Sequence, residues 1–145
     1  MVCVMKRKNT DQLLKELMDS NDLSRVLSDN SACFREGDLP HGLQALFDQQ
    51  DMSKSALAKV SGISEVYLHQ VFSGRRTPSR DRLLCLCIGL GASTEETQSL
   101  LQQAHHAPLY ARDKRDAVLL FGLSHSLTLP EINDALFTAG AETLL

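Results

Sequence analysis

The sequence predicts an all-α protein, on three observations. Apolar residues recur every three or four positions along most of the chain, which places them on one face of a helix. Ser and Thr precede several of these runs and Gly follows them, as expected at helix ends. No segment reads convincingly as a strand. With 145 residues, 43% of them hydrophobic, the chain can bury a core as one domain or as two small helical subdomains.

Residues 1–36 are predicted to form an N-terminal helical extension. The stretch TDQLLKELMDSNDLSRVLS, residues 10–28, carries two groups of apolar residues at helical spacing. Thr10 is a candidate N-cap for its start, and Ser20 or Asn21 is a candidate N-cap further along. The polar stretch DNSACFREGD then separates the extension from the rest of the chain.

Residues 37–93 are predicted to form a central helical domain. Its first helix begins in LPHGLQALFDQQ with Pro40 near the first turn, where a missing N–H is tolerated. Its last helix opens with Thr77 and Pro78 and contains the apolar run LLCLCIGL.

Two short helices lie between these, joined across VSGIS. Ser53 caps the first, and Gly62 ends it because a residue without a Cβ adopts a left-handed turn most easily. Ser64 caps the second helix, which Gly74 closes. Ile63 follows the turn and is expected to enter the core, which fixes the angle between the helices. Two short helices held in this way are what a helix-turn-helix requires.

Residues 94–145 are predicted to form a C-terminal helical region that is part of a duplicated hairpin. The sequence from Pro78 aligns with the sequence from Asp113, so that Arg80-Asp81 matches Arg115-Asp116 at an offset of 35 residues. Each copy reads as helix, short loop, helix. Two copies are too few for a solenoid, so we expect one duplicated hairpin packed beside the basic segment. Chance similarity between two amphipathic hairpins is the alternative.

The charge is unevenly distributed along the chain, whose formal net charge is −3. From Ser53 to Arg82, six basic residues stand against two acidic ones, which leaves +4. From Leu83 to the end, three basic residues stand against seven acidic ones, which leaves −4. Taken alone, this pattern also fits an ordinary solvated surface, but the basic segment coincides with the two short helices.

The stretch MSKSALAKVSGISEVYLHQVFSGRRTPSRDRLLCLCIGLGAS resembles the Xre family, helix-turn-helix regulators with the fold of the lambda-type repressors and Cro. The family pattern is met in register by Ser53, Leu57, Ala58, Gly62, Ile63, Ser64, Leu68, Val71, Gly74, Arg75, Arg76, Pro78 and Ser79. The resemblance covers about Leu39 to Ser93. It implies a lambda-repressor-like helix-turn-helix domain in a sequence-specific transcriptional regulator, a homodimer that binds double-stranded DNA through the major groove.

The resemblance also implies which residues contact DNA. Lys54 would meet a phosphate or support a reading side chain, the exposed side of the second short helix would face bases, and the residues after that helix suit the phosphate backbone. The expected DNA-binding residues are Lys54, Ser55, Ser64, Glu65, Val66, His69, Gln70, Ser73, Arg75 and Arg76.

The roles of three residues in this segment need separate comment. Phe72 stands where the family commonly has an acidic residue, so we expect it to fill the core. Glu65 stands where an amide or arginine is frequent, and it either contacts a base or stabilises the helix dipole. His69 is either a base contact or a solvated surface residue.

No pattern in the sequence predicts an enzyme, a metal site or a cofactor. There is no phosphate-binding glycine loop or nucleophile motif, and the four cysteines form neither a CxxC pair nor a zinc-ligand spacing with the histidines. Cys85 and Cys87 are expected to be small buried hydrophobes. The start MVCVMKRKN is unlike a secretory signal and no apolar run can cross a bilayer, so we expect a cytoplasmic protein without membrane contact.

A second class of function remains open at the level of sequence. The chain could be a protein-interaction module, such as an antitoxin or adaptor, that keeps a helix-turn-helix scaffold without using DNA. In that case the acidic C-terminal hairpin, Asp113 to Leu145, is the expected surface for a protein partner.

Overall fold

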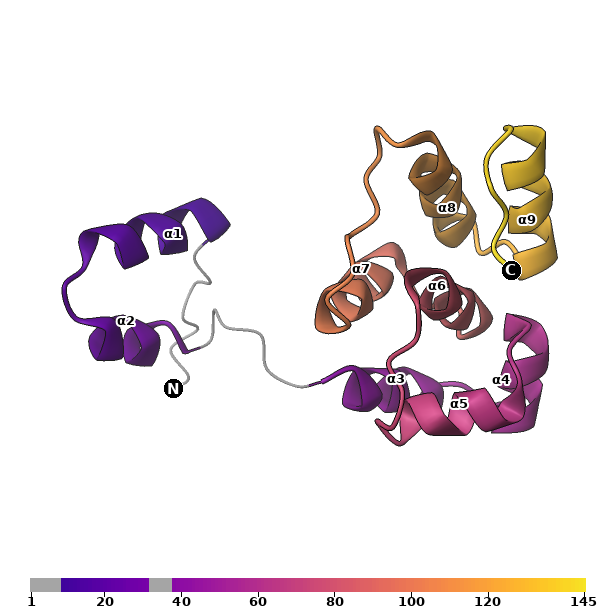
Figure 1. Cartoon of the computed structure of the whole chain (residues 1–145), viewed down its shortest axis with the longest axis horizontal. Helices are drawn as coiled ribbons and strands as arrows, with labels where there is room; N and C mark the ends of the chain where they lie inside the picture. Colours follow the sequence, from indigo (N-terminus) through magenta and orange to yellow (C-terminus); the bar gives the residue numbers. More distant parts are fainter. Residues whose placement is uncertain (1–8, 32–37) are drawn as a thin grey trace. The chain divides into compact units, whose positions relative to one another are not determined.

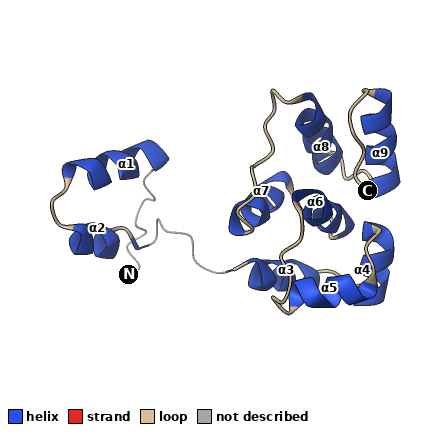
Figure 2. Ribbon diagram, in the orientation of Figure 1, coloured by secondary structure: helices blue, strands red, loops and turns tan. Residues whose placement is uncertain are grey.

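The computed structural model describes residues 9–31 and 38–145 of the chain (Figure 1). Every regular element in these residues is a helix, which confirms the predicted all-α class (Figure 2). The chain divides into two compact units, Met1–Glu36 and Gly37–Leu145. The helices are α1 (Thr10–Asp19), α2 (Leu23–Asp29), α3 (Leu39–Asp48), α4 (Lys54–Ser61), α5 (Glu65–Phe72), α6 (Arg80–Gly89), α7 (Thr94–Gln103), α8 (Lys114–Ser124) and α9 (Leu129–Thr138).

The N-terminal unit contains the predicted helical extension, but different residues cap its helices. Asn9 caps α1: its side chain accepts a hydrogen bond from the backbone N–H of Gln12, whose side chain accepts one from the backbone N–H of Asn9. Asp22 caps α2. The predicted caps, Thr10 and Ser20 or Asn21, are therefore wrong by one or two positions, because a neighbouring Asn or Asp was equally suited to the role.

In the second unit α6 lies at the centre, in contact with α4, α7 and α9 (Figure 1). Its residues Leu83 to Cys87 are all completely buried, so the helix is covered on every side. Leu43, Leu57 and Leu68, from α3, α4 and α5, are equally buried and belong to the same core. Burial on this scale supplies the main driving force for folding.

The start of α6 differs from the prediction. Ser79, and not Thr77 or Pro78, caps the helix: its side chain accepts a hydrogen bond from the backbone N–H of Arg82. Pro78 therefore precedes the helix, in extended chain that leads from α5 to α6. Arg82 is therefore the third residue of the helix.

Cys85 and Cys87 are completely buried in α6, as expected for small hydrophobes. Burial in apolar surroundings raises the pKa of each thiol to about 12. Both thiols therefore stay protonated through the neutral range. Cys3 and Cys33 lie outside the described residues.

These two cysteines are expected not to react with a thiol reagent in the folded protein. In a Cys3→Ser/Cys33→Ser variant at about pH 8, labelling should become fast only after denaturation, because the reactive species is the thiolate. Labelling without denaturant at the rate of an exposed cysteine would contradict this burial.

The two hairpins of the second unit make matching contacts. Helices α6 and α7 form one hairpin, α8 and α9 form the other, and the same interactions recur 35 positions apart. Gln98 exchanges two hydrogen bonds with the backbone of Leu109, and Asn133 exchanges the same two with Leu144. Ser93 caps α7, and Thr128 caps α9, with matching capping boxes. Such matched detail favours duplication over chance.

Two reciprocal ion pairs join the hairpins. Arg80 donates to both oxygens of Asp116 at 3.2 and 3.1 Å, and Arg115 donates to both oxygens of Asp81 at 2.9 and 3.1 Å. Each arginine also donates to two backbone carbonyls of its own copy, which are Ala107 and Pro108 for Arg80 and Glu142 and Thr143 for Arg115. The two copies thus face each other with approximate two-fold symmetry.

The C-terminal hairpin shares its core with the central helices. Leu119, Ile132, Leu136 and Leu144 are completely buried in the core that contains α4 to α6. The predicted division between residues 93 and 94 falls inside this unit, between α6 and α7, and stays a prediction. Deleting the C-terminal hairpin would expose the shared core, so substitutions on its surface are the cleaner probe of a partner site.

Candidate nucleic-acid interface

Helices α4 and α5 meet at the predicted glycine corner. Gly62 has φ 66° and ψ 24°, a left-handed conformation that favours glycine. The backbone N–H of Ile63 donates to the carbonyl of Ala58 at 3.1 Å, which closes the end of α4. Ile63 itself is buried, as are Ala58 and Leu68 on the facing sides of the two helices. The corner therefore holds α5 at a fixed angle to α4.

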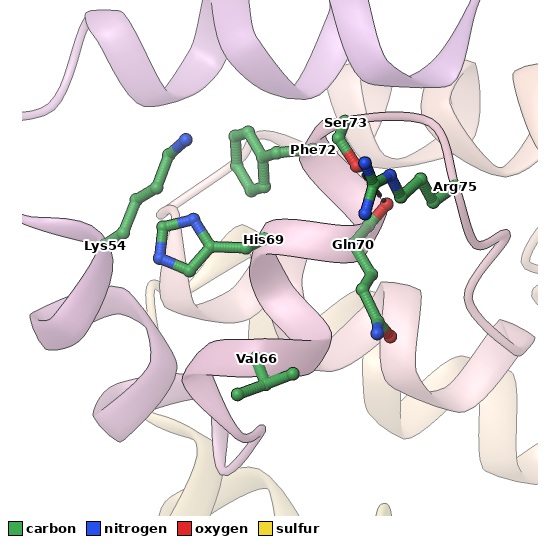
Figure 3. A pocket seen from close by; sticks show the side chains of 7 residues that line it. All are labelled: Lys54, Val66, His69, Gln70, Phe72, Ser73 and Arg75. Carbon is green, nitrogen blue, oxygen red and sulfur yellow. Dashed lines mark hydrogen bonds between the residues drawn. The ribbon is translucent and has the colours of Figure 1, made fainter.

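One side of α5 is open to solvent within this unit. Figure 3 shows Val66, His69, Gln70 and Ser73 on this side, around an open hollow of about 550 Å³. Val66 is 69% exposed and so presents an apolar side chain on this side of the helix. The hollow is lined by Lys54, Val66, His69, Gln70, Phe72, Ser73 and Arg75.

The structure thus brings six of the expected residues together around the hollow, and four lie outside its lining. Ser55 and Arg76 are exposed. The side-chain oxygen of Ser64 accepts a hydrogen bond from the backbone N–H of Tyr67, so this residue serves as the N-cap of α5. Glu65 is exposed in the first turn, with its carboxylate 3.7 Å from Nε2 of His69.

Phe72 fills the core, as expected. Its ring is 8% exposed and packs edge-on against Phe47, with 5.6 Å between the ring centroids. Nζ of Lys54 lies 5.0 Å from the centroid of Phe72 and 6.0 Å from that of Phe47. The two rings therefore hold the ammonium group at one edge of the open side of α5 by a cation–π contact.

The loop after α5 is tied to the end of the helix. The backbone N–H groups of Arg75 and Arg76 both donate to the carbonyl of Gln70, at 3.0 and 3.2 Å, and the hydroxyl of Ser73 donates to the same oxygen. Arg75 and Arg76 are exposed. Their backbone is thus fixed next to the residues of α5 that line the hollow.

The structure corrects the charge count made from the sequence. Arg80 belonged to the basic segment, but its guanidinium is committed to Asp116 and to two carbonyls. Asp81, counted as an acid of that segment, is committed to Arg115. Arg82 is the exposed cation of α6, and its Cζ lies 4.5 Å from the ring centroid of Tyr67.

Arg82 and Tyr67 were not expected as site residues. No local sequence pattern separates Arg80 from Arg82, since both lie in one basic run. Helical spacing places the two arginines, which are two positions apart, on different faces of the helix, but it does not say which of them turns inward.

Comparison with known families bears on this segment. A family model described as a helix-turn-helix domain matches residues 38–100. These residues form a helix-turn-helix domain. The match runs from the N-cap of α3 into α7, so the helix-turn-helix domain includes the corner, the open side of α5 and the central helix α6. No curated protein and no solved structure matches the chain.

Two features are absent from the described residues. None of their helices combines the length and the apolar character needed to cross a membrane. They also contain no group of three or more His, Cys, Asp or Glu residues arranged to hold a metal ion.

Proposed function

We propose that this protein is a sequence-specific regulator of transcription of the Xre type, which binds double-stranded DNA by placing α5 in the major groove. The observation that carries the proposal is the open side of α5, a surface of long polar and apolar side chains with cations at its edges. A helix of this kind, held at a fixed angle by a helix-turn-helix, fits the width of the groove. We place such a regulator in the cytoplasm.

The residues on the open side suit direct contact with bases. The amide of Gln70 can pair with the N6 and N7 edge of adenine, and the exposed Val66 can contact the methyl group of thymine. His69 can donate to or accept from a base edge. Lys54, Arg75 and Arg76 flank these residues and suit phosphates, because backbone contacts need charge and donors.

The proposed active form is a homodimer. Two copies of α5 would lie about 34 Å apart and read successive major grooves on one side of a palindromic site. A footprint with two protected half-sites one turn apart would support this dimer.

DNA binding is expected to depend steeply on salt. If Lys54, Arg75 and Arg76 each neutralise one phosphate in both subunits, the plot of log K against log salt should have a slope of about −5. Fluorescence anisotropy with a duplex from the region upstream of its own gene measures this slope. Binding that responds to neither sequence nor salt would contradict the proposal.

A Gln70→Ala variant separates base reading from backbone contact. It should lose about 1–3 kcal/mol of affinity for the specific site and keep its affinity for a scrambled duplex, because only the base contact is removed. Equal losses on both duplexes would place Gln70 outside the reading surface.

A protein-interaction module is the second candidate, favoured by the acidic C-terminal hairpin with its exposed Phe137. The two functions predict different results in the same assay. An interaction module that does not use DNA should show no duplex binding at low salt, where a regulator binds most tightly.

A further inference from the structure

We infer that Tyr67, Arg76 and Arg82 form a phosphate-binding site beside α5. We call Arg76 and Arg82 the arginine pair. The ligand of this site is the backbone of one DNA strand, at one phosphate or two consecutive phosphates. The inference rests on the proposed function and adds to it a contact residue in α6, Arg82, and a supporting ring, Tyr67.

Both guanidinium groups lie over one aromatic ring. Cζ of Arg76 is 5.1 Å from the ring centroid of Tyr67, and Cζ of Arg82 is 4.5 Å from it. The arginines themselves are exposed, whereas Tyr67 is only 8% exposed. Two side chains from different parts of the chain, the loop after α5 and the first turn of α6, thus converge on one point of the surface.

This point lies at the edge of the open side of α5. Successive residues of a helix are 100° apart, so Tyr67 and Phe72 stand on opposite flanks of the strip formed by Val66, His69 and Ser73. Lys54 rests on the ring of Phe72 at one flank. The arginine pair rests on Tyr67 at the other. A helix lying in the major groove has a phosphate backbone on each side, and each flank of α5 carries cations held by an aromatic ring.

The arginine pair also differs from the other arginines of this region in its charge interactions. Arg80 and Arg115 are each engaged by a carboxylate and two carbonyls. Within residues 9–31 and 38–145, neither Arg76 nor Arg82 forms an ion pair with a carboxylate. Two guanidinium groups without a counter-charge at one point of the surface favour an anion there.

Contact with the ring prepares the arginines for a phosphate. A cation–π contact leaves the N–H groups of a guanidinium without an acceptor, so they can donate to two phosphate oxygens. The ring also restricts a long flexible side chain before binding, so less conformational entropy is lost in the complex.

The first test uses Arg76→Gln and Arg82→Gln in the full chain, with Arg112→Gln as the matched control. Arg112 is an exposed arginine in the segment between α7 and α8. Each variant of the pair should bind the specific duplex about tenfold more weakly and reduce the salt slope by about 0.9 per lost phosphate contact. Sequence preference should not change, because phosphates carry no base identity.

The second test locates the phosphate. Duplexes with a single neutral methylphosphonate at successive positions should reveal one site, or two consecutive sites, whose neutralisation weakens binding of the wild type. If the arginines hold two phosphates, each variant should lose sensitivity only at the phosphate of its missing arginine; if they share one phosphate, both variants should lose part of their sensitivity at that site.

A third comparison tests the ring. Tyr67→Phe keeps the aromatic face and should bind like the wild type, whereas Tyr67→Leu should bind several-fold more weakly although its thermal unfolding remains cooperative. If the wild type binds DNA and Arg82→Gln behaves like Arg112→Gln, the arginine pair is overturned while the proposed function stands. If the wild type binds no duplex, the proposed function fails and this inference fails with it.

Discussion

An Asp116→Asn variant is expected to lose about 3 kcal/mol of free energy of unfolding, because it leaves the charge of Arg80 without its counter-ion. The side chain of Asp116 is only 10% exposed. Its carboxylate accepts two hydrogen bonds from Arg80 and one from the backbone N–H of Tyr110 at 3.0 Å. Urea unfolding followed by circular dichroism measures the change.

The matched control is Asp81→Asn, at the equivalent position of the first copy. The side chain of Asp81 is 37% exposed, so water can replace part of its interaction with Arg115 and we expect a loss of about 1 kcal/mol or less. The hydrogen bond to Asp81 raises the pKa of Arg115 above its ordinary value, so the guanidinium stays charged through the neutral range. Equal losses in the two variants would contradict the burial difference between the two pairs.

A Gly122→Ala variant is expected to lose about 2 kcal/mol of stability although alanine is the better helix former. A Cβ at Gly122 would lie 2.6 and 2.7 Å from two side-chain atoms of Ile132, which is completely buried in α9. Overpacking of this kind costs about 3 kcal/mol, and the gain in helix propensity returns about 1 kcal/mol. Thermal or urea unfolding measures the balance, and an unchanged or raised stability would contradict it.

The first copy shows how the clash can be relieved. Cys87 and Thr97 occupy the positions equivalent to Gly122 and Ile132, and the hydroxyl of Thr97 donates to the carbonyl of Ser93 at 2.8 Å. The first copy thus pairs the larger Cys87 with the smaller Thr97, and the second pairs the smaller Gly122 with the larger Ile132. The Gly122→Ala/Ile132→Thr double variant should therefore lose less stability than the sum of the two single variants, by about 1 kcal/mol.

The C-terminal hairpin also contacts the helix-turn-helix corner. A Cβ at Gly62 would lie 3.6 Å from Leu129 and 4.0 Å from Leu145, so both leucines pack near the turn between α4 and α5. The same packing that stabilises the hairpin supports the angle of α5. In the Asp116→Asn and Gly122→Ala variants, DNA affinity should therefore fall only as far as the fraction of folded protein falls. The sequence preference of the folded fraction should not change.

Much of the fold could be predicted from the sequence because its determinants are local. Ser53 and Ser64 each cap a helix by accepting a hydrogen bond from a backbone N–H three residues later, and Gly62 adopts a left-handed conformation that few other residues tolerate. The repeat was visible because matching residues, such as Arg80-Asp81 and Arg115-Asp116, recur at an offset of 35. Where two capping residues were adjacent, as at Asn9 and Thr10, local patterns could not choose between them.

The sequence by itself determined the helices, the glycine corner and the side of α5 that is left outward, because hydrogen bonds within a few residues and apolar spacing decide these features. Only the tertiary structure decided which arginines of the basic segment remain available: Arg80 turns inward to Asp116, and Arg82 turns outward over Tyr67. Partners 36 residues apart along the chain meet only when the two hairpins pack. The sequence therefore tells which side chains are charged, but the packing of the hairpins decides which counter-ion each of them has.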